Sequence, residues 1–196
     1  VNSHVKRLDP RVAEALSRAG CKILKLGIES GSPRVRKEIL KRHMTQSDVL
    51  LTVASAEEYD LHTSGFVMIG LPGETPEERL ETVDILAQSR IGRFRTSFFF
   101  PFPGTESYRM TLEAGLIDPD ADSSLTTFTD GSALDFGPEQ NLSIDKLGVC
   151  MPWFVNARMA HFHDDAPASA RYQPIVDEVL AMTEGEWRAF RDQVRA

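Results

Sequence analysis

Three apolar segments constrain the fold of this 196-residue chain most strongly. Each segment is followed by a glycine-containing turn and by the start of a helix; the segments are residues 22–28, 63–71 and 94–100. The second is almost continuously apolar, which is typical of a parallel strand covered on both faces. Strands that alternate with helical segments indicate right-handed βα units around a parallel sheet. The sequence therefore predicts an α/β fold that is three strands deep.

Helix starts between these segments support this interpretation. A capping residue followed by proline at the first helical position occurs at Asp9-Pro10, Ser32-Pro33 and Thr75-Pro76. The expected helices span residues 10–19, 33–42, 46–59, 76–89 and 105–114. Residues 1–3 are interpreted as the tail of a preceding strand. Three parallel strands leave an open sheet edge, so we expect the neighbouring strands to lie upstream of Val1.

The C-terminal part of the chain has a different pattern. Residues 117–140 are rich in Asp, Ser, Thr and Gly and predict a long irregular connection. Two helices are expected after it, over residues 143–162 and 168–195. The predicted domain organisation is residues 1–116 as βα units, 117–142 as the irregular connection and 143–196 as a helical extension.

Composition excludes several classes of protein. The formal net charge is −7, with a sequence pI of about 5.3, which argues against a nucleic-acid partner because such partners need a basic face. No apolar run approaches the roughly 20 residues that span a bilayer, and no signal peptide is visible. With two isolated cysteines, Cys21 and Cys150, we expect a reducing, cytoplasmic environment. Because no Met precedes Val1, we expect the chain to begin inside a longer protein.

The candidate ligand-binding residues follow the strands. In parallel α/β sheets ligands collect at the carboxyl ends of strands. Glu29-Ser30 offers acceptors there, although it can also be a plain turn and helix cap. Gly70 to Gly73 forms a tight turn that lacks the Walker lysine and the Rossmann glycine spacing. Phe100-Pro101 belongs to an aromatic cluster that can stack an adenine or simply pack in the core.

The order and spacing of these turns resemble a known family. The segments AGCKILKLGIESGSPRVRKEILKR, GFVMIGLPGETPEERLETVDIL and FFFPFPGTESY look like strands four, five and six of the radical S-adenosylmethionine (SAM) superfamily, each with the residues that follow it. The resemblance covers residues 2–116 and implies the C-terminal half of a partial (β/α)6 TIM-like barrel with a mainly helical extension. Within the superfamily, the chain resembles the cobalamin-associated branch of methyltransferases and anaerobic cyclases.

The resemblance implies a SAM-binding site, residue by residue. Glu29 and Ser30 match the position that contacts the ribose and the methionine part of SAM. Lys41 matches a basic position that pairs with the methionine carboxylate, and Arg42 is its rival for that role. The remaining SAM-binding candidates match the ends of three further strands: Asn2, Ser3, Met68, Ile69, Gly70, Gly73, Glu74, Phe100 and Pro101.

The chain departs from the family at the iron–sulfur cluster. The family holds a [4Fe–4S] cluster with a C-x3-C-x2-C motif, and two distant cysteines cannot supply three adjacent thiolates. No metal ligand is therefore predicted here, and the cluster is expected from a missing N-terminal half or a partner chain. With that part, the resemblance implies reductive cleavage of SAM to a 5′-deoxyadenosyl radical, with cobalamin-dependent methyl transfer or cyclisation as the narrower reaction. Catalytic residues and the small-molecule substrate are left unassigned.

Two alternatives remain open at this point. The first is a non-catalytic, degenerate barrel module that binds a partner subunit. The second concerns His161 and His163, which together with Asp164-Asp165 look like part of a metal motif. No third ligand is placed by the spacing, so we interpret this cluster as a polar helix end.

Overall fold

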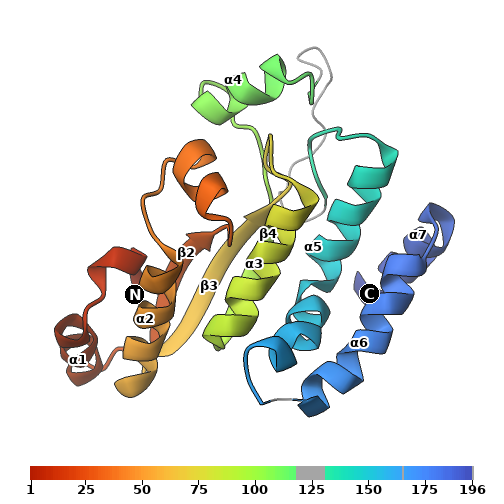
Figure 1. The fold of residues 1–196 in the computed structure, drawn as a ribbon. Coiled ribbons are helices and arrows are strands. Elements are labelled where there is room, and N and C mark those ends of the chain that lie inside the picture. Colours follow the sequence, from red (N-terminus) through yellow and green to blue (C-terminus); the bar gives the residue numbers. More distant parts are fainter. Residues whose placement is uncertain (118–130, 165, 196) are drawn as a thin grey trace. The chain divides into compact units, whose positions relative to one another are not determined.

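The computed structural model describes residues 1–117, 131–164 and 166–195 (Figure 1). Its four strands form a sheet in the order β1-β2-β3-β4; the strands are β1 (Asn2–Ser3), β2 (Ile23–Glu29), β3 (His62–Ile69) and β4 (Arg93–Phe98). β1, β2 and β3 pair in parallel registers, so the predicted tail of a preceding strand at residues 1–3 is confirmed.

β4 runs in the same direction as β3. Before β4, the amide of Gly92 donates to Thr63 Oγ1 near the start of β3 at 3.1 Å. After β4, the amide of Phe99 donates to the carbonyl of Ile69 at the end of β3 at 2.9 Å. The α/β fold class is thereby confirmed: a parallel sheet built from βα connections, as expected for the C-terminal half of a partial TIM-like barrel, followed by helices.

Burial along the strands differs from the prediction in one respect. Leu24, Leu26 and Ile28 of β2 are fully buried, and alternate residues of β3 are buried as well. The other face of β3 is only half-buried, although its sequence predicted a strand covered on both faces. The apolar composition of a strand shows that both of its faces could be buried. Whether both are buried depends on the elements that pack against each face.

The helices predicted over residues 10–19, 46–59 and 76–89 form as predicted. They are α1 (Pro10–Arg18), α2 (Gln46–Glu58) and α3 (Pro76–Ser89), and a short 3₁₀ turn, η1 (Val5–Arg7), follows β1. Asp9 caps α1 by accepting from the amide of Val12 at 2.9 Å. Capping boxes begin α2 and α3, where the capping threonine and the acidic residue three positions later exchange hydrogen bonds.

The helix predicted over residues 33–42 is wrong in its type and in its end. The structure has a π-helix there, η2 (Val35–Ile39), in which the amide of Leu40 donates to the carbonyl of Val35. Lys41 then adopts the left-handed conformation, with φ of 53°, and this ends the helix. Propensity predicts a helix here but cannot distinguish an i→i+4 turn from an i→i+5 turn.

The C-terminal helices are α4 (Glu106–Glu113), α5 (Pro138–Arg158), the 3₁₀ turn η3 (Met159–His161), α6 (Ala166–Ala181) and α7 (Glu184–Arg195). α5 begins earlier than predicted, because Pro138 occupies its first position after Gly137 at φ of 86°. Part of the predicted irregular connection, residues 118–130, lies outside the described residues.

The single tail helix predicted over residues 168–195 is also wrong, because the chain breaks between α6 and α7. Thr183 and Glu186 form a reciprocal cap that starts α7. The buried ammonium of Lys146 donates to the carbonyls of Leu180 and Met182, at 3.0 and 2.6 Å. These carbonyls at the end of α6 are thus satisfied by a lysine of α5 instead of by a continuing helix.

The chain forms two compact units. Unit 1 comprises residues 1–68 and 73–97, and unit 2 comprises residues 69–72 and 98–196. The domain boundaries expected from the sequence stay a prediction. Within the described ranges, none of the helices has the length and apolar character needed to cross a membrane.

Candidate functional site

The carboxyl end of β2, in unit 1, has an unusual backbone. Glu29 ends the strand with φ of 66°, and the register to β3 shifts between Gly27 and Glu29. A non-glycine residue in this conformation costs about 1–3 kcal/mol, and such strain concentrates at functional sites. Bulges of this kind redirect a side chain at the end of a strand. The local structure therefore directs Glu29 differently from the alternating residues before it.

Glu29 pairs with Arg42, which follows η2. Arg42 Nη2 lies 3.1 Å from Glu29 Oε1, with side-chain exposures of 38% and 14%. Both groups lie over Gly27: a Cβ atom added there would be 2.5 Å from Glu29 Oε1 and 3.2 Å from Arg42 Nη1. The missing side chain of Gly27 thus leaves room for the ion pair against the strand.

Burial makes the charged form of the Glu29 carboxylate less stable than it would be in water. Burial raises its pKa, and the nearby Arg42 guanidinium lowers it by a smaller amount. Desolvation therefore outweighs the one cation beside it. A further hydrogen-bond donor supplied by a ligand would stabilise the charged form. This arrangement suits a ligand that carries hydroxyl or ammonium donors.

The turn after Glu29 is held from within unit 1. Ser30 is fully buried, and its Oγ accepts from the amide of Ser32 at 3.1 Å. Thr82 of α3 accepts from the amide of Gly31 at 2.8 Å. The hydroxyl of Ser30 therefore holds the turn, and the carboxylate of Glu29 is the more exposed acceptor of the predicted pair.

The two basic candidates after η2 differ in their surroundings. Lys41 is exposed, whereas Arg42 is half-buried and contacts Glu29. The amide of Arg42 donates to the carbonyl of Arg36 at 2.7 Å, which closes the turn at the left-handed Lys41. The structure thus brings Arg42, the rival candidate, beside Glu29.

The turn after β3 is fastened by an arginine from the start of the η2 region. Arg34 Nη2 donates to the carbonyl of Gly73 at 2.7 Å and to Glu78 Oε2 at 2.6 Å. Glu78 also accepts from Ser32 Oγ at 3.0 Å, and these bonds hold its pKa at about 2. Glu74 is buried beside this network. Gly73, a predicted contact, is therefore fixed through its carbonyl.

The other predicted residues fall into both units. Asn2 and Ser3 pair with Lys25 and Leu26, three residues or more before Glu29, so they lie about 10 Å back along the sheet. Met68 is half-buried in unit 1.

Four of the predicted contacts, Ile69, Gly70, Phe100 and Pro101, belong to unit 2. Ile69, Gly70 and Pro101 are buried, and the rings of Phe100 and Phe102 lie 4.9 Å apart.

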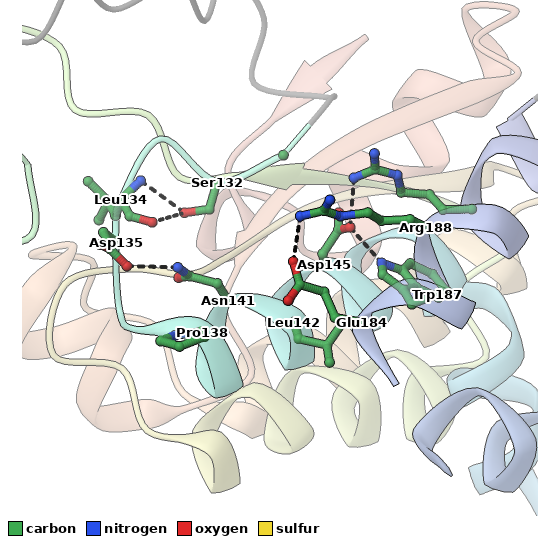
Figure 2. A pocket seen from close by; sticks show the side chains of 12 residues that line it. Ser132, Leu134, Asp135, Pro138, Asn141, Leu142, Asp145, Glu184, Trp187 and Arg188 are labelled. Carbon is green, nitrogen blue, oxygen red and sulfur yellow. Dashed lines mark hydrogen bonds and ion pairs between the residues drawn. The ribbon is translucent and has the colours of Figure 1, made fainter. Parts of the chain in front are cut away.

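Unit 2 contains a cavity of about 520 Å³ that the sequence did not predict (Figure 2). The loop before α5, the first turns of α5 and α7 line it. Asp145 Oδ2 accepts from the indole of Trp187 at 2.7 Å and from Arg191 Nη1 at 3.0 Å. Arg188 pairs with Glu184 along α7. Most of the polar groups here bond to one another, so the lining is chiefly structural.

The two cysteines lie in different units, Cys21 in unit 1 and Cys150 in unit 2. Cys21 Sγ is 3.5 Å from the carbonyl of Ile23, and burial raises the pKa of Cys150 to about 12. A thiol with such a pKa is protonated and is a poor ligand. Within residues 1–117, 131–164 and 166–195, no group of three His, Cys, Asp or Glu side chains could hold a metal ion. Asp165, part of the histidine cluster considered above, lies outside these ranges.

Several curated proteins and a family model over residues 1–86 show what this chain is similar to. The family model of the radical SAM superfamily matches residues 1–86. An uncharacterized methyltransferase of Pyrococcus horikoshii is 30% identical over 116 residues, covering 59% of this chain and 25% of the relative. Cytidylyl-2-hydroxyethylphosphonate methyltransferase of Streptomyces wedmorensis is 28% identical over 133 residues, covering 64% and 24%. Bacteriochlorophyllide d C-12(1)-methyltransferase of Chlorobaculum tepidum is 28% identical over 96 residues, covering 49% and 21%.

These matches confirm the resemblance to the radical SAM superfamily over residues 1–86. The chain spans about a quarter of the length of these curated relatives. The matched region contains β1 to β3 and most of α3, and hence Glu29, Arg42 and the turn at Gly73.

Proposed function

We propose that this chain supplies the SAM-binding βα units of a radical SAM methyltransferase. The observation that carries the proposal is Glu29: a carboxylate on strained backbone at a strand end, desolvated enough to raise its pKa, with one arginine beside it. The superfamily match over residues 1–86 supports SAM as the ligand. The names of three relatives support methyl transfer rather than cyclisation as the reaction class.

Different residues of the chain would contact different groups of SAM. Glu29 would accept hydrogen bonds from the ribose hydroxyls or from the methionine ammonium, which are the donors that its environment lacks. Arg42 would pair with the methionine carboxylate, since it already lies within 3.1 Å of Glu29. Lys41 remains the candidate favoured by the resemblance. Ser30 would act by holding the turn.

Among the other predicted contacts, Met68, Gly73 and Glu74 belong to unit 1 with Glu29, and the resemblance implies that they contact SAM. Ile69, Gly70, Phe100 and Pro101 belong to unit 2, and their contact with SAM stays a prediction from the resemblance. Asn2 and Ser3 are weaker candidates because of their register with β2.

The described residues do not fit the iron–sulfur cluster, so its ligands would come from outside this chain. Reductive cleavage of SAM to a 5′-deoxyadenosyl radical is the chemistry that the cluster supplies in this superfamily. Cobalamin-dependent methyl transfer is a narrower form of the proposal and rests on the resemblance alone. A non-catalytic partner-binding module is not favoured by any observation on the described residues.

Calorimetric titration of SAM into the full-length protein that contains this chain tests the proposal. We expect Glu29→Ala to weaken SAM binding by about 10- to 100-fold, since a charge-assisted hydrogen bond contributes roughly 1.5–3 kcal/mol. The melting temperature should change little. Glu113→Ala is the matched control, because Glu113 pairs with Arg109 on the exposed surface of α4. Unchanged SAM affinity with a lowered melting temperature for Glu29→Ala would assign Glu29 to the fold alone.

A further inference from the structure

A buried arginine lies beneath the turn that ends β2. Arg36, on η2, has no exposed surface. Its Nη1 donates to two successive main-chain carbonyls, those of Ser30 at 2.7 Å and Gly31 at 3.1 Å. Its Nη2 lies 3.4 Å from Gln46 Oε1. The guanidinium therefore holds the two residues that directly follow Glu29.

This position is costly for a cation. Burial lowers the pKa of Arg36, and the charges of Glu81 and Asp48 offset this only in part. The acceptors of its hydrogen bonds are oxygens of neutral groups, and its Nε has no hydrogen-bond partner among the described residues. The guanidinium is therefore kept in place at a desolvation cost, and its close hydrogen bonds go to main-chain carbonyls rather than to a carboxylate.

What the arginine supplies is geometry. Glu29 sits at φ of 66°, a conformation that persists only when its surroundings fix it. Thr82 holds the amide of Gly31 from α3, while Arg36 holds the carbonyls of Ser30 and Gly31 from η2. The π-helical turn places Arg36 among the buried residues of η2, together with Val35 and Ile39.

We propose that Arg36 is a positioning residue: it locks the turn after β2 and thereby presets the Glu29 carboxylate for its ligand. This inference rests on the proposed function, because the ligand is taken to be SAM. Arg36 itself is fully buried and does not contact the ligand. Its contribution is that Glu29 does not have to be ordered when SAM binds, which improves affinity without adding a contact.

The test compares Arg36→Leu and Arg36→Lys with the wild type in the full-length protein. SAM affinity is measured by calorimetry, and amide hydrogen exchange of residues 30–32 is measured without ligand. Arg36→Leu should weaken SAM binding about tenfold and raise exchange in this turn, and the melting temperature should fall because the carbonyls of Ser30 and Gly31 lose their donor. Arg36→Lys should restore part of both losses, because an ammonium can still donate to the carbonyls.

Lys146→Met is the matched control. Lys146 is also a buried cation that donates to two main-chain carbonyls, but it belongs to unit 2. Its replacement should lower the melting temperature, because two carbonyls lose their donor. SAM affinity and exchange at residues 30–32 should stay unchanged.

The inference would be overturned if Arg36→Leu had the SAM affinity and the amide hydrogen exchange of the wild type. An increase in amide hydrogen exchange spread evenly over the protein would also overturn it. If Arg36→Leu does not fold, Arg36→Lys alone decides by the same two measurements. If the wild type does not bind SAM, the proposed function fails, and the exchange measurement still shows whether Arg36 locks the turn.

Discussion

Two carboxylate–arginine pairs in this protein are nearly identical as ion pairs. In unit 1, Glu29 and Arg42 are 3.1 Å apart, with side-chain exposures of 14% and 38%. In unit 2, Asp145 and Arg191 are 3.0 Å apart, with exposures of 17% and 32%. Distance and burial alone would assign both pairs the same role.

Their surroundings separate them. Asp145 lies on regular α-helix and also accepts from the indole of the buried Trp187, so it ties α5 to α7. Glu29 lies on left-handed backbone at a bulge, over a glycine, and links a strand end to the turn after η2. One pair holds helices together on relaxed backbone, whereas the other keeps a carboxylate in a strained position. Backbone strain, more than ion-pair geometry, distinguishes the candidate binding residue.

Replacing Asp145 should give the largest effect. Asp145→Ala leaves the Trp187 indole and the Arg191 guanidinium without their shared acceptor, which we expect to lower the free energy of unfolding by about 3 kcal/mol. Urea unfolding measures this loss. SAM affinity should not change. Glu184→Ala, which removes the neighbouring exposed pair with Arg188, should shift stability by less than about 0.5 kcal/mol. A comparable loss in both variants would contradict the structural role of Asp145.

Adding one methyl group at Gly27 should give an intermediate effect. In Gly27→Ala the new Cβ displaces only the ends of the flexible Glu29 and Arg42 side chains, so stability should fall by less than about 1 kcal/mol. SAM affinity should fall about tenfold, because the displaced groups are the proposed contacts. In Gly92→Ala, just before β4, the atoms nearest to the new Cβ are those of the His62 ring. This control should keep the SAM affinity of the wild type. Equal SAM affinities in Gly27→Ala and Gly92→Ala would show that the Glu29–Arg42 pair does not contribute to SAM binding.

A further carboxylate–arginine pair of unit 1, Glu78 with Arg34, should give the smallest effect. The folded-state pKa of Glu78 is about 2, against 4.5 as its ordinary value. The stability it contributes is present above pH 4.5 and is lost as the pH falls towards 2. Because Arg34 is 42% exposed, we expect this contribution to be about 1 kcal/mol. Urea unfolding at pH 5 and pH 3 should show a smaller difference in Glu78→Gln than in the wild type. An equal difference would exclude Glu78 as a source of acid sensitivity.

Much of the fold of unit 1 could be predicted because its signals are local. The caps at Asp9 and Thr75 begin helices where the sequence places them, and α2 begins at the predicted residue 46. In unit 2, the sequence contains the Pro138 start and the Thr183–Glu186 cap, yet the boundaries predicted there were wrong. Their signals compete with continuous helical propensity, and the carbonyls at the break are satisfied by Lys146, which is distant in sequence.

The candidate site was predictable to the level of a strand end. Glu29 could be selected because carboxyl ends of parallel strands collect ligands, and the resemblance to the superfamily assigned it to SAM. Arg36 carried no comparable signal, since a buried arginine within a helical pattern looks like a solvated one. Asp145 and the cavity around it also escaped prediction, because their lining comes from segments separated by more than forty residues.

By itself, the sequence determined the alternation of strands and helices, the start of each strongly capped helix and the acceptor at the tip of β2. These features depend on contacts within a few residues, which a single sequence contains in full. Only the tertiary structure decided that Arg42 rather than Lys41 lies beside Glu29 and that Arg36 lies beneath the turn. Both outcomes depend on the π-helical turn η2, on the left-handed Lys41 and on Gly27, which has no side chain to occupy the space of the ion pair. Together they bring into contact groups that lie on different elements of unit 1.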